Sequence, residues 1–165
     1  MSEPENLASS LPARSVQVAG VLAEAGVPGQ VRVLARSART AAEAASALGC
    51  DVGAIANSLV FVSGDEAVLV LTSGGHKVDT AALAARWGRP ELRRATPEQV
   101  RQATGQVIGG VAPVGHPRPL PTVVDEALTG HPRVWAAAGT PHTVFPTTAD
   151  ELLRLTGGRL LPVGP

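Results

Sequence analysis

The segment with the clearest chemical potential is 105–115, which reads GQVIGGVAPVG. Glycines let a backbone approach a ligand closely, and successive amides that point at one place can bind an anion or stabilise a developing oxyanion. The residues fit a plain connection between a helix and a strand equally well. The segment is not a Walker phosphate-binding loop, because no Lys-Ser or Lys-Thr pair follows it, and its spacing does not match the dinucleotide fingerprint.

Histidine is the next side chain that could do chemistry, and it occurs at His76, His116, His131 and His142. No pair has the spacing of an HxH or HExxH motif, and the chain has a single cysteine. We therefore predict that the protein binds no metal and needs no other cofactor. His116 adjoins the glycine-rich segment and His142 precedes an expected strand, so these two could face a shared pocket. A loop or edge position explains each of them slightly better.

Covalent catalysis has no candidate nucleophile. Cys50 follows a predicted helix end, where the helix dipole disfavours a thiolate, so we interpret it as a small packed residue. No Gly-x-Ser-x-Gly elbow occurs. Lys77 is the only lysine and lies in a turn before a predicted helix. An exposed turn explains Lys77 better than a contact with RNA does, although both interpretations stay open.

Length and composition indicate a globular chain of ordinary domain size. The chain has 165 residues, 44% of them apolar, and a formal net charge of zero. Zero charge argues against a broad basic surface that would hold nucleic acid by its phosphates. The absence of a second cysteine and of a signal-peptide pattern predicts a cytoplasmic protein. No apolar run is long enough to span a bilayer, so we expect no membrane association.

The elements that must position these residues follow from periodicity and capping signals. We expect strands at 31–34, 59–62, 67–72, 91–95, 122–124, 134–137, 143–145 and 160–163, with helices at 15–25, 41–48, 80–87, 97–104 and 149–155. Thr40 with Glu43, Thr96 with Gln99 and Thr148 with Glu151 match the capping-box pattern. Residues 51–56 look like a further helical turn, and 106–121 are too irregular for a regular element.

This mixture predicts an α/β fold. A hairpin around 63–66 argues against a purely parallel sheet, so we expect a mixed β-sheet or distorted barrel with surrounding helices. Residues 1–12 are polar and contain proline, which predicts a flexible N-terminal arm. Residues 13–165 are then expected to form one domain.

Several segments in order resemble the YbaK/ProX family, which is related to the editing domain of bacterial prolyl-tRNA synthetase. Residues 55–61, IANSLVF, look like the family segment I-x-K-[ST]-L-V-F, and 104–115 resemble its loop T-G-x-x-x-G-G-V-x-P-x-G. Residues 67–79, 123–125 and 138–156 are similar to its further strand and helix patterns. The resemblance covers roughly 35–163 and rests on the order and spacing of the motifs together.

The resemblance implies trans-editing, the hydrolysis of the ester that joins a wrong amino acid to the 3′ end of a tRNA, without a metal. Carried over to this chain, the amides of Gly109 and Gly110 would face the substrate. Val111 and Pro113 of the same loop, Ser58 and His142 would contact the substrate. Lys77 would contact tRNA. The resemblance is compatible with a homodimer. The sequence predicts neither the amino acid nor the tRNA species.

The main departure from the family pattern is at Asn57, where the family has lysine. An amide can donate a hydrogen bond but carries no charge for a phosphate or an oxyanion. Asn57 therefore keeps a second hypothesis open, in which the protein binds tRNA or an aminoacyl-nucleoside-like ligand without hydrolysing it. Hydrolysis of a different small acyl ester is a third hypothesis, which would suit the neutral surface.

Overall fold

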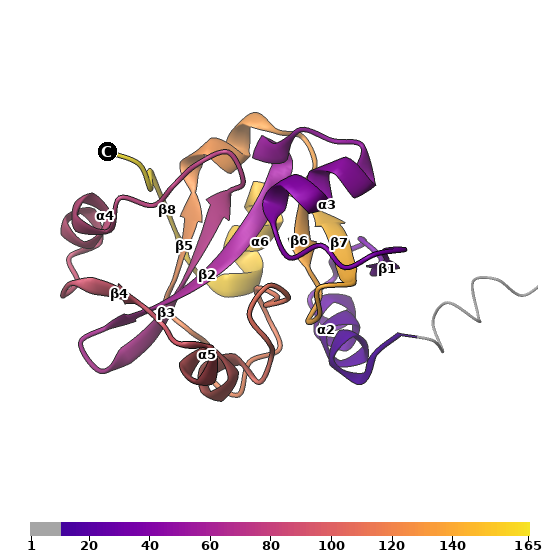
Figure 1. The fold of residues 1–165 in the computed structure, drawn as a ribbon, viewed down its shortest axis with the longest axis horizontal. Coiled ribbons are helices and arrows are strands. Elements are labelled where there is room, and N and C mark those ends of the chain that lie inside the picture. The colour runs from indigo at the N-terminus through magenta and orange to yellow at the C-terminus, as the bar shows by residue number, and fades with distance from the viewer. Residues whose placement is uncertain (1–10) are drawn as a thin grey trace, which may run out of the picture.

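The computed structural model describes residues 11–165 (Figure 1). Most of the predicted N-terminal arm, residues 1–10, lies outside the described residues. The helices are α2 (Ala13–Glu24), α3 (Ala41–Leu48), α4 (Thr80–Trp87), α5 (Pro97–Thr104) and α6 (Ala149–Thr156), with 3₁₀ turns η1 (Val52–Ala54) and η2 (Glu126–Gly130). The strands are β1 (Arg32–Val33), β2 (Ile55–Ser63), β3 (Glu66–Ser73), β4 (Leu92–Arg94), β5 (Thr122–Asp125), β6 (Val134–Ala137), β7 (Thr143–Thr147) and β8 (Arg159–Leu161).

The strands form one eight-stranded mixed sheet in the order β1-β7-β6-β2-β3-β5-β8, and β4 pairs with β2 outside this path. The pairs β2–β3, β2–β4, β6–β7 and β1–β7 are antiparallel, whereas β2–β6, β3–β5 and β5–β8 are parallel. The prediction of a mixed α/β sheet with surrounding helices is therefore confirmed. No helix within residues 11–165 is long and apolar enough to cross a membrane.

Strand β2 organises the sheet because it has three neighbours. One edge pairs with β3 along the whole strand, while the other pairs with β6 at Ile55 and Ala56 and with β4 from Phe61 to Ser63. The strand starts earlier than expected, since Ile55 and Ala56 belong to it rather than to a helical turn. Only Val52–Ala54 form that turn. Asn57 and Ser58 lie between the stretches that pair with β6 and β4, and both pair with β3 on the other edge.

Local signals in the sequence explain where the helices begin and end. Thr40 and Thr96 form capping boxes with Glu43 and Gln99, as predicted, and Thr148 accepts a hydrogen bond from the Glu151 amide. Helices α3, α4, α5 and α6 each end at a glycine in the left-handed conformation. Helix α3 is one of these four helices, and it borders the pocket described below.

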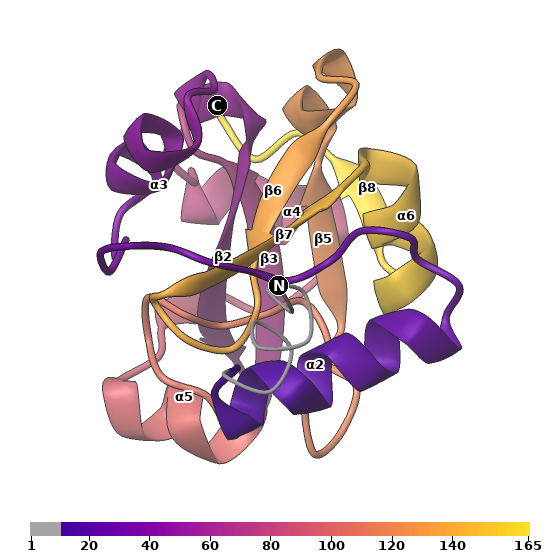
Figure 2. The same cartoon turned by 90° about the vertical axis from the view of Figure 1, so that its right-hand side faces the viewer.

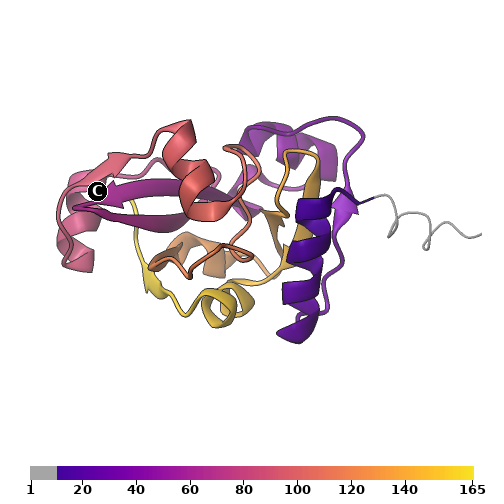
Figure 3. The ribbon, with the colours of Figure 1, turned by 90° about the horizontal axis from the view of Figure 1, so that it is seen from below.

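Helices cover both faces of the sheet (Figures 2 and 3). Leu69 and Leu71 of β3 point into the largest core cluster, with residues of α2 and α6, whereas Val68 and Val70 point to the opposite face, with residues of α4. This alternation is the period of two expected of a strand that is buried on both faces. Helix α3 packs through a third cluster, which includes Trp135 of β6.

Candidate functional site

A small pocket lies where α3, the first half of β2, strands β6 and β7 and the glycine-rich loop meet. Its volume is about 40 Å³, and roughly 10–15 Å³ accommodates one water molecule, so it has room for a small side chain. The pocket is lined by Ala38, Arg39, Thr40, Ala41, Ala44, Ile55, Ala56, Asn57, Ser58, Gly109, Val111, Trp135, Ala136, Ala137, Thr140, Pro141, Thr143 and Val144. Eleven of these residues have apolar side chains and six have polar ones.

Four residues singled out from the sequence lie together in this lining: Asn57 and Ser58 from β2, and Gly109 and Val111 from the loop. In the chain, β2 and the loop are separated by β3, α4, β4 and α5, so only the tertiary fold brings these residues together. The buried Ser58 Oγ has no hydrogen-bond partner within residues 11–165. Less than 1 Å² of this oxygen is accessible, so it is buried in the wall of the pocket and not exposed to it.

Backbone amides of the loop provide the second unsatisfied feature. Within the described chain, neither the Gly109 nor the Val111 N–H donates a backbone or side-chain hydrogen bond. The Gly110 N–H, between them, donates to the Val107 carbonyl at 3.0 Å. The alternation leaves two amides, two residues apart, available to a group in the pocket. Buried amides are nearly always paired, so such a pair is a candidate oxyanion-binding site.

The loop holds its shape through the side chain of Gln106, which is 2% exposed. Its Oε1 accepts from the Ala112 amide at 2.7 Å, and its Nε2 donates to the Val114 carbonyl at 3.2 Å. The Gln106 amide donates to Thr104 Oγ1. One side chain thus bridges the loop from the end of α5 to its far side. This role of Gln106 is not predicted from the sequence, in which the only signal is a glutamine within an otherwise apolar and glycine-rich stretch.

The two central glycines are required for different reasons. Gly109 has a φ of 89°, in the region that favours glycine. Gly110 is required because of space, since a Cβ there would lie 2.4 Å from the carbonyl carbon of Thr140 and 2.7 Å from the Pro141 nitrogen. Gly110 therefore lets the loop pack directly on the backbone that precedes β7.

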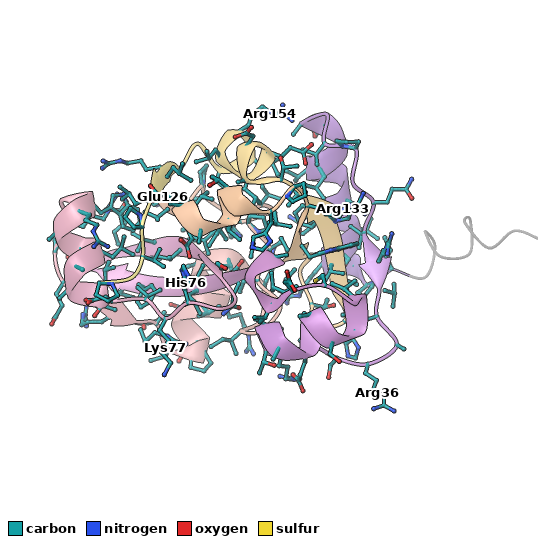
Figure 4. All side chains as sticks on the ribbon, turned by 90° about the horizontal axis from the view of Figure 1, so that it is seen from above. Arg36, His76, Lys77, Glu126, Arg133 and Arg154 are labelled. Atoms are coloured by element: carbon teal, nitrogen blue, oxygen red, sulfur yellow. The ribbon has the colours of Figure 1, made fainter. Side chains whose placement is uncertain are left out.

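Several sequence-predicted residues do not line the pocket. His142 is exposed, and Pro113 is buried outside the lining. Gly110 packs behind the pocket wall, with its N–H in the turn described above. Lys77 is also exposed, and Figure 4 shows it directed away from the body of the protein. The roles assigned to these four residues stay predictions.

Two ionisable side chains, Cys50 and His116, have a shifted pKa. Burial lowers the pKa of His116, whose Nε2 lies 2.7 Å from the Ala112 carbonyl, so the imidazole braces the loop rather than the pocket. Burial and the nearby Asp51 carboxylate raise the pKa of the Cys50 thiol, which agrees with a packed rather than nucleophilic cysteine.

A second polar cluster lies at the C-terminal end of β3. The buried Asp125 carboxylate accepts hydrogen bonds from the amides of Ser73 and Ala127, and its Oδ2 lies 3.1 Å from His76 Nδ1. These bonds tie β3, the following turn and η2 together. Within the part of the chain that the structure describes, no group of three or more His, Cys, Asp and Glu residues could hold a metal ion.

Known proteins are similar to this chain over most of its length. A family model described as an aminoacyl-tRNA editing domain matches residues 35–155. A crystal structure of a candidate trans-editing enzyme for prolyl-tRNA synthetase superposes with a TM-score of 0.88 at 47% identity, covering 94% of this chain and 99% of the other.

Two curated relatives extend this comparison. The uncharacterised protein YwhH of Bacillus subtilis (strain 168) is 31% identical over 117 residues, which cover 70% of this chain and 74% of that protein. A proline–tRNA ligase of Nitratidesulfovibrio vulgaris (strain DP4) is 34% identical over 97 residues, which are 59% of this chain but 16% of the ligase. The similarity thus covers about three quarters of a small protein in one case and a short part of a much larger one in the other.

Proposed function

The chain belongs to the family of aminoacyl-tRNA editing domains, and from this premise we propose that it hydrolyses in trans the ester bond of a mischarged aminoacyl-tRNA. The observation that carries the proposal is the pair of unpaired amides in Gly109 and Val111, two residues that line the pocket. Ester hydrolysis passes through a tetrahedral oxyanion, and two preorganised amides are the donors that this intermediate requires.

The assignment of roles follows from the chemistry of each group. The Gly109 and Val111 amides would hold the ester carbonyl oxygen as it gains negative charge. Asn57 would donate a hydrogen bond that positions the substrate, and the contact of Ser58 with the substrate stays a prediction. No histidine or carboxylate is among the described lining residues. The contribution of the pocket side chains is therefore hydrogen bonding and exclusion of the wrong substrates.

The size of the pocket supports a small amino acid as the substrate. A volume of about 40 Å³ with walls of Ala44, Ala136 and Trp135 would admit a methyl or hydroxymethyl group and exclude a branched chain of four carbons. An apolar pocket distinguishes side chains that differ by one methylene by about 1–3 kcal/mol. We propose alanine, serine and cysteine as the amino acids to be removed.

The wider setting follows from this substrate. We propose that the partner is the 3′ end of an aminoacyl-tRNA, that residues 13–165 act as one domain, and that the protein works in the cytoplasm, where tRNAs are charged. A homodimer is compatible with this function but is not required by it, since all the proposed contacts come from one chain.

The first test is deacylation of tRNAs that carry Ala, Cys, Ser, Thr or Pro by the purified protein, with and without EDTA. We expect turnover that EDTA does not change, with the smallest side chains removed fastest. Turnover abolished by EDTA and restored by a divalent metal would contradict the metal-free mechanism. An intact panel of substrates would contradict the proposed hydrolysis.

Asn57 is the specific observation that favours a second candidate function, binding without hydrolysis. The Asn57→Ala variant separates the two. If Asn57 positions the substrate during hydrolysis, we expect kcat/KM to fall by about 10- to 100-fold, the effect of a lost buried hydrogen bond. Binding of an amide-linked aminoacyl-adenosine without turnover by the unmodified protein would favour the second function instead.

A further inference from the structure

The substrate carries negative charge that the described pocket must accept, and Asn57 cannot balance it. A tRNA 3′ end brings a phosphate into the neighbourhood of the ester, on the 5′ side of the terminal adenosine. Asn57 carries no charge, and the exposed Lys77 lies outside the pocket lining. Arg39 is the one lysine or arginine among the lining residues that the structure describes.

The backbone of Arg39 lies beside the glycine-rich loop. Its amide donates to Glu43 Oε1 at 3.1 Å, as part of the capping arrangement that starts α3. A Cβ built on Gly109 would lie 3.7 Å from both Cβ and Cγ of Arg39. The aliphatic part of the arginine thus packs against the loop that carries the unpaired amides, and its charged end extends from there.

The Arg39 guanidinium is also available. Within residues 11–165 it has no carboxylate, carbonyl or aromatic partner, and the side chain is exposed. Other arginines are engaged: Arg89 pairs with Glu66 and Arg86 donates to the Pro162 carbonyl. Arg32 lies over the ring of Trp135, 4.9 Å from its centroid, outside the pocket lining.

We propose that Arg39 binds the phosphate of the 3′-terminal nucleotide and so supplies the positive charge that no other lining residue provides. This inference rests on the proposed function. A guanidinium binds phosphate with two parallel hydrogen bonds, which an amide at Asn57 cannot do. A phosphate is preferred over the oxyanion as the ligand because Arg39 is exposed at the rim, whereas the Gly109 and Val111 amides line the pocket itself.

The proposal predicts which kinetic constant changes. A phosphate carries the same charge in the ground state and the transition state, so a contact with it stabilises both equally. Losing the contact therefore raises KM and leaves kcat nearly unchanged. A contact with the oxyanion would instead lower kcat, because that charge develops only in the transition state.

The experiment compares Arg39→Gln and Arg39→Lys with a matched control, Arg36→Gln. Arg36 lies in the same segment but outside the pocket lining, and Figure 4 shows it pointing away from the protein. The substrates are aminoacyl-CCA, which carries the phosphate, and aminoacyl-adenosine, which does not. Amide-linked versions of both serve for binding measurements, so the test does not depend on turnover.

For the CCA compounds, we expect Arg39→Gln to raise the KM of the ester and the Kd of the amide-linked version by about 10- to 100-fold. Arg39→Lys should recover part of this loss, Arg36→Gln should cause none, and the adenosine compounds should be unaffected throughout. Equal losses on both kinds of compound, or no loss on either, would overturn the role of Arg39. Selective binding without hydrolysis would contradict the proposed function and leave the phosphate site supported.

Discussion

Individual side chains in this protein divide into those that contact the pocket and those that shape the loop beside it. Asn57 and Ser58 belong to the first group, and both lie in β2, which begins before the strand start expected at residue 59. Gln106 and His116 belong to the second, since both bond to loop carbonyls or amides without lining the pocket. A glutamine or histidine with no recognisable motif around it gives no such indication in a sequence.

His116 makes the stability of the protein sensitive to acid. Burial lowers its pKa from an ordinary value of 6.5, so the unfolded chain takes up a proton first as the pH falls. The unfolded state then binds more protons than the folded state, and the free energy of unfolding decreases below about pH 6.5. The decrease ends once the folded protein is protonated as well.

Urea unfolding at pH 7.5, 6.5 and 5.5 tests this prediction on the unmodified protein and His116→Gln. Glutamine can still donate to the Ala112 carbonyl but does not titrate. We expect the unmodified protein to lose more stability between pH 6.5 and 5.5 than the variant does. Parallel curves would show that His116 does not carry the effect.

Among the elements, the glycine-rich loop depends most on close backbone packing. Its left-handed Gly109 and its crowded Gly110 are both positions where a side chain is excluded, whereas Gly105 and Gly115 have a positive φ but no neighbour closer than 3.4 Å. Gly20, in the interior of α2, has an ordinary φ and open space around it. We therefore expect substitution by alanine to have opposite effects at these two kinds of glycine.

We expect Gly110→Ala to lower kcat/KM at least 100-fold, because the new Cβ would push the loop off the Thr140 backbone and misplace the amides. Gly20→Ala should leave activity unchanged and raise the free energy of unfolding by about 0.5–1 kcal/mol, the difference between the two residues in a helix. Deacylation assays and thermal unfolding on both variants check this pair. Full activity in Gly110→Ala would show that the close packing does not position the amides.

For the whole molecule, the charge balance limits how nucleic acid can bind. The formal net charge is zero, and many of the arginines are engaged in contacts with carbonyls, carboxylates or rings. A protein of this kind makes few phosphate contacts, and we infer that recognition concentrates on the 3′ end rather than on the body of the tRNA.

Salt dependence measures the number of those contacts. Each phosphate contact on a single strand contributes a slope of about −0.7 to log affinity against log salt. With one to three contacts, we expect kcat/KM to fall with a slope of about −0.7 to −2 over the range of 50–300 mM salt. A slope steeper than about −4 would require an extended basic surface on the tRNA body.

Sequence alone determined most of the elements, because their signals are local. Capping boxes join residues three apart, glycines end helices within one turn, and the hairpin of β2 and β3 closes over a short turn. The order of motifs was enough to identify the family. It was also enough to select four residues that the structure brings into one pocket: Asn57, Ser58, Gly109 and Val111.

Only the tertiary structure decided what depends on segments that are distant in the chain. The parallel strands β2 and β6 are not joined by a short turn, so no local signal in the sequence predicts their pairing. This pairing places Trp135 in the pocket wall. The approach of Arg39 to Gly109 joins the start of α3 to a loop beyond α5. Such contacts are fixed by burial and packing of the whole sheet, and no spacing of residue types in the sequence encodes them locally.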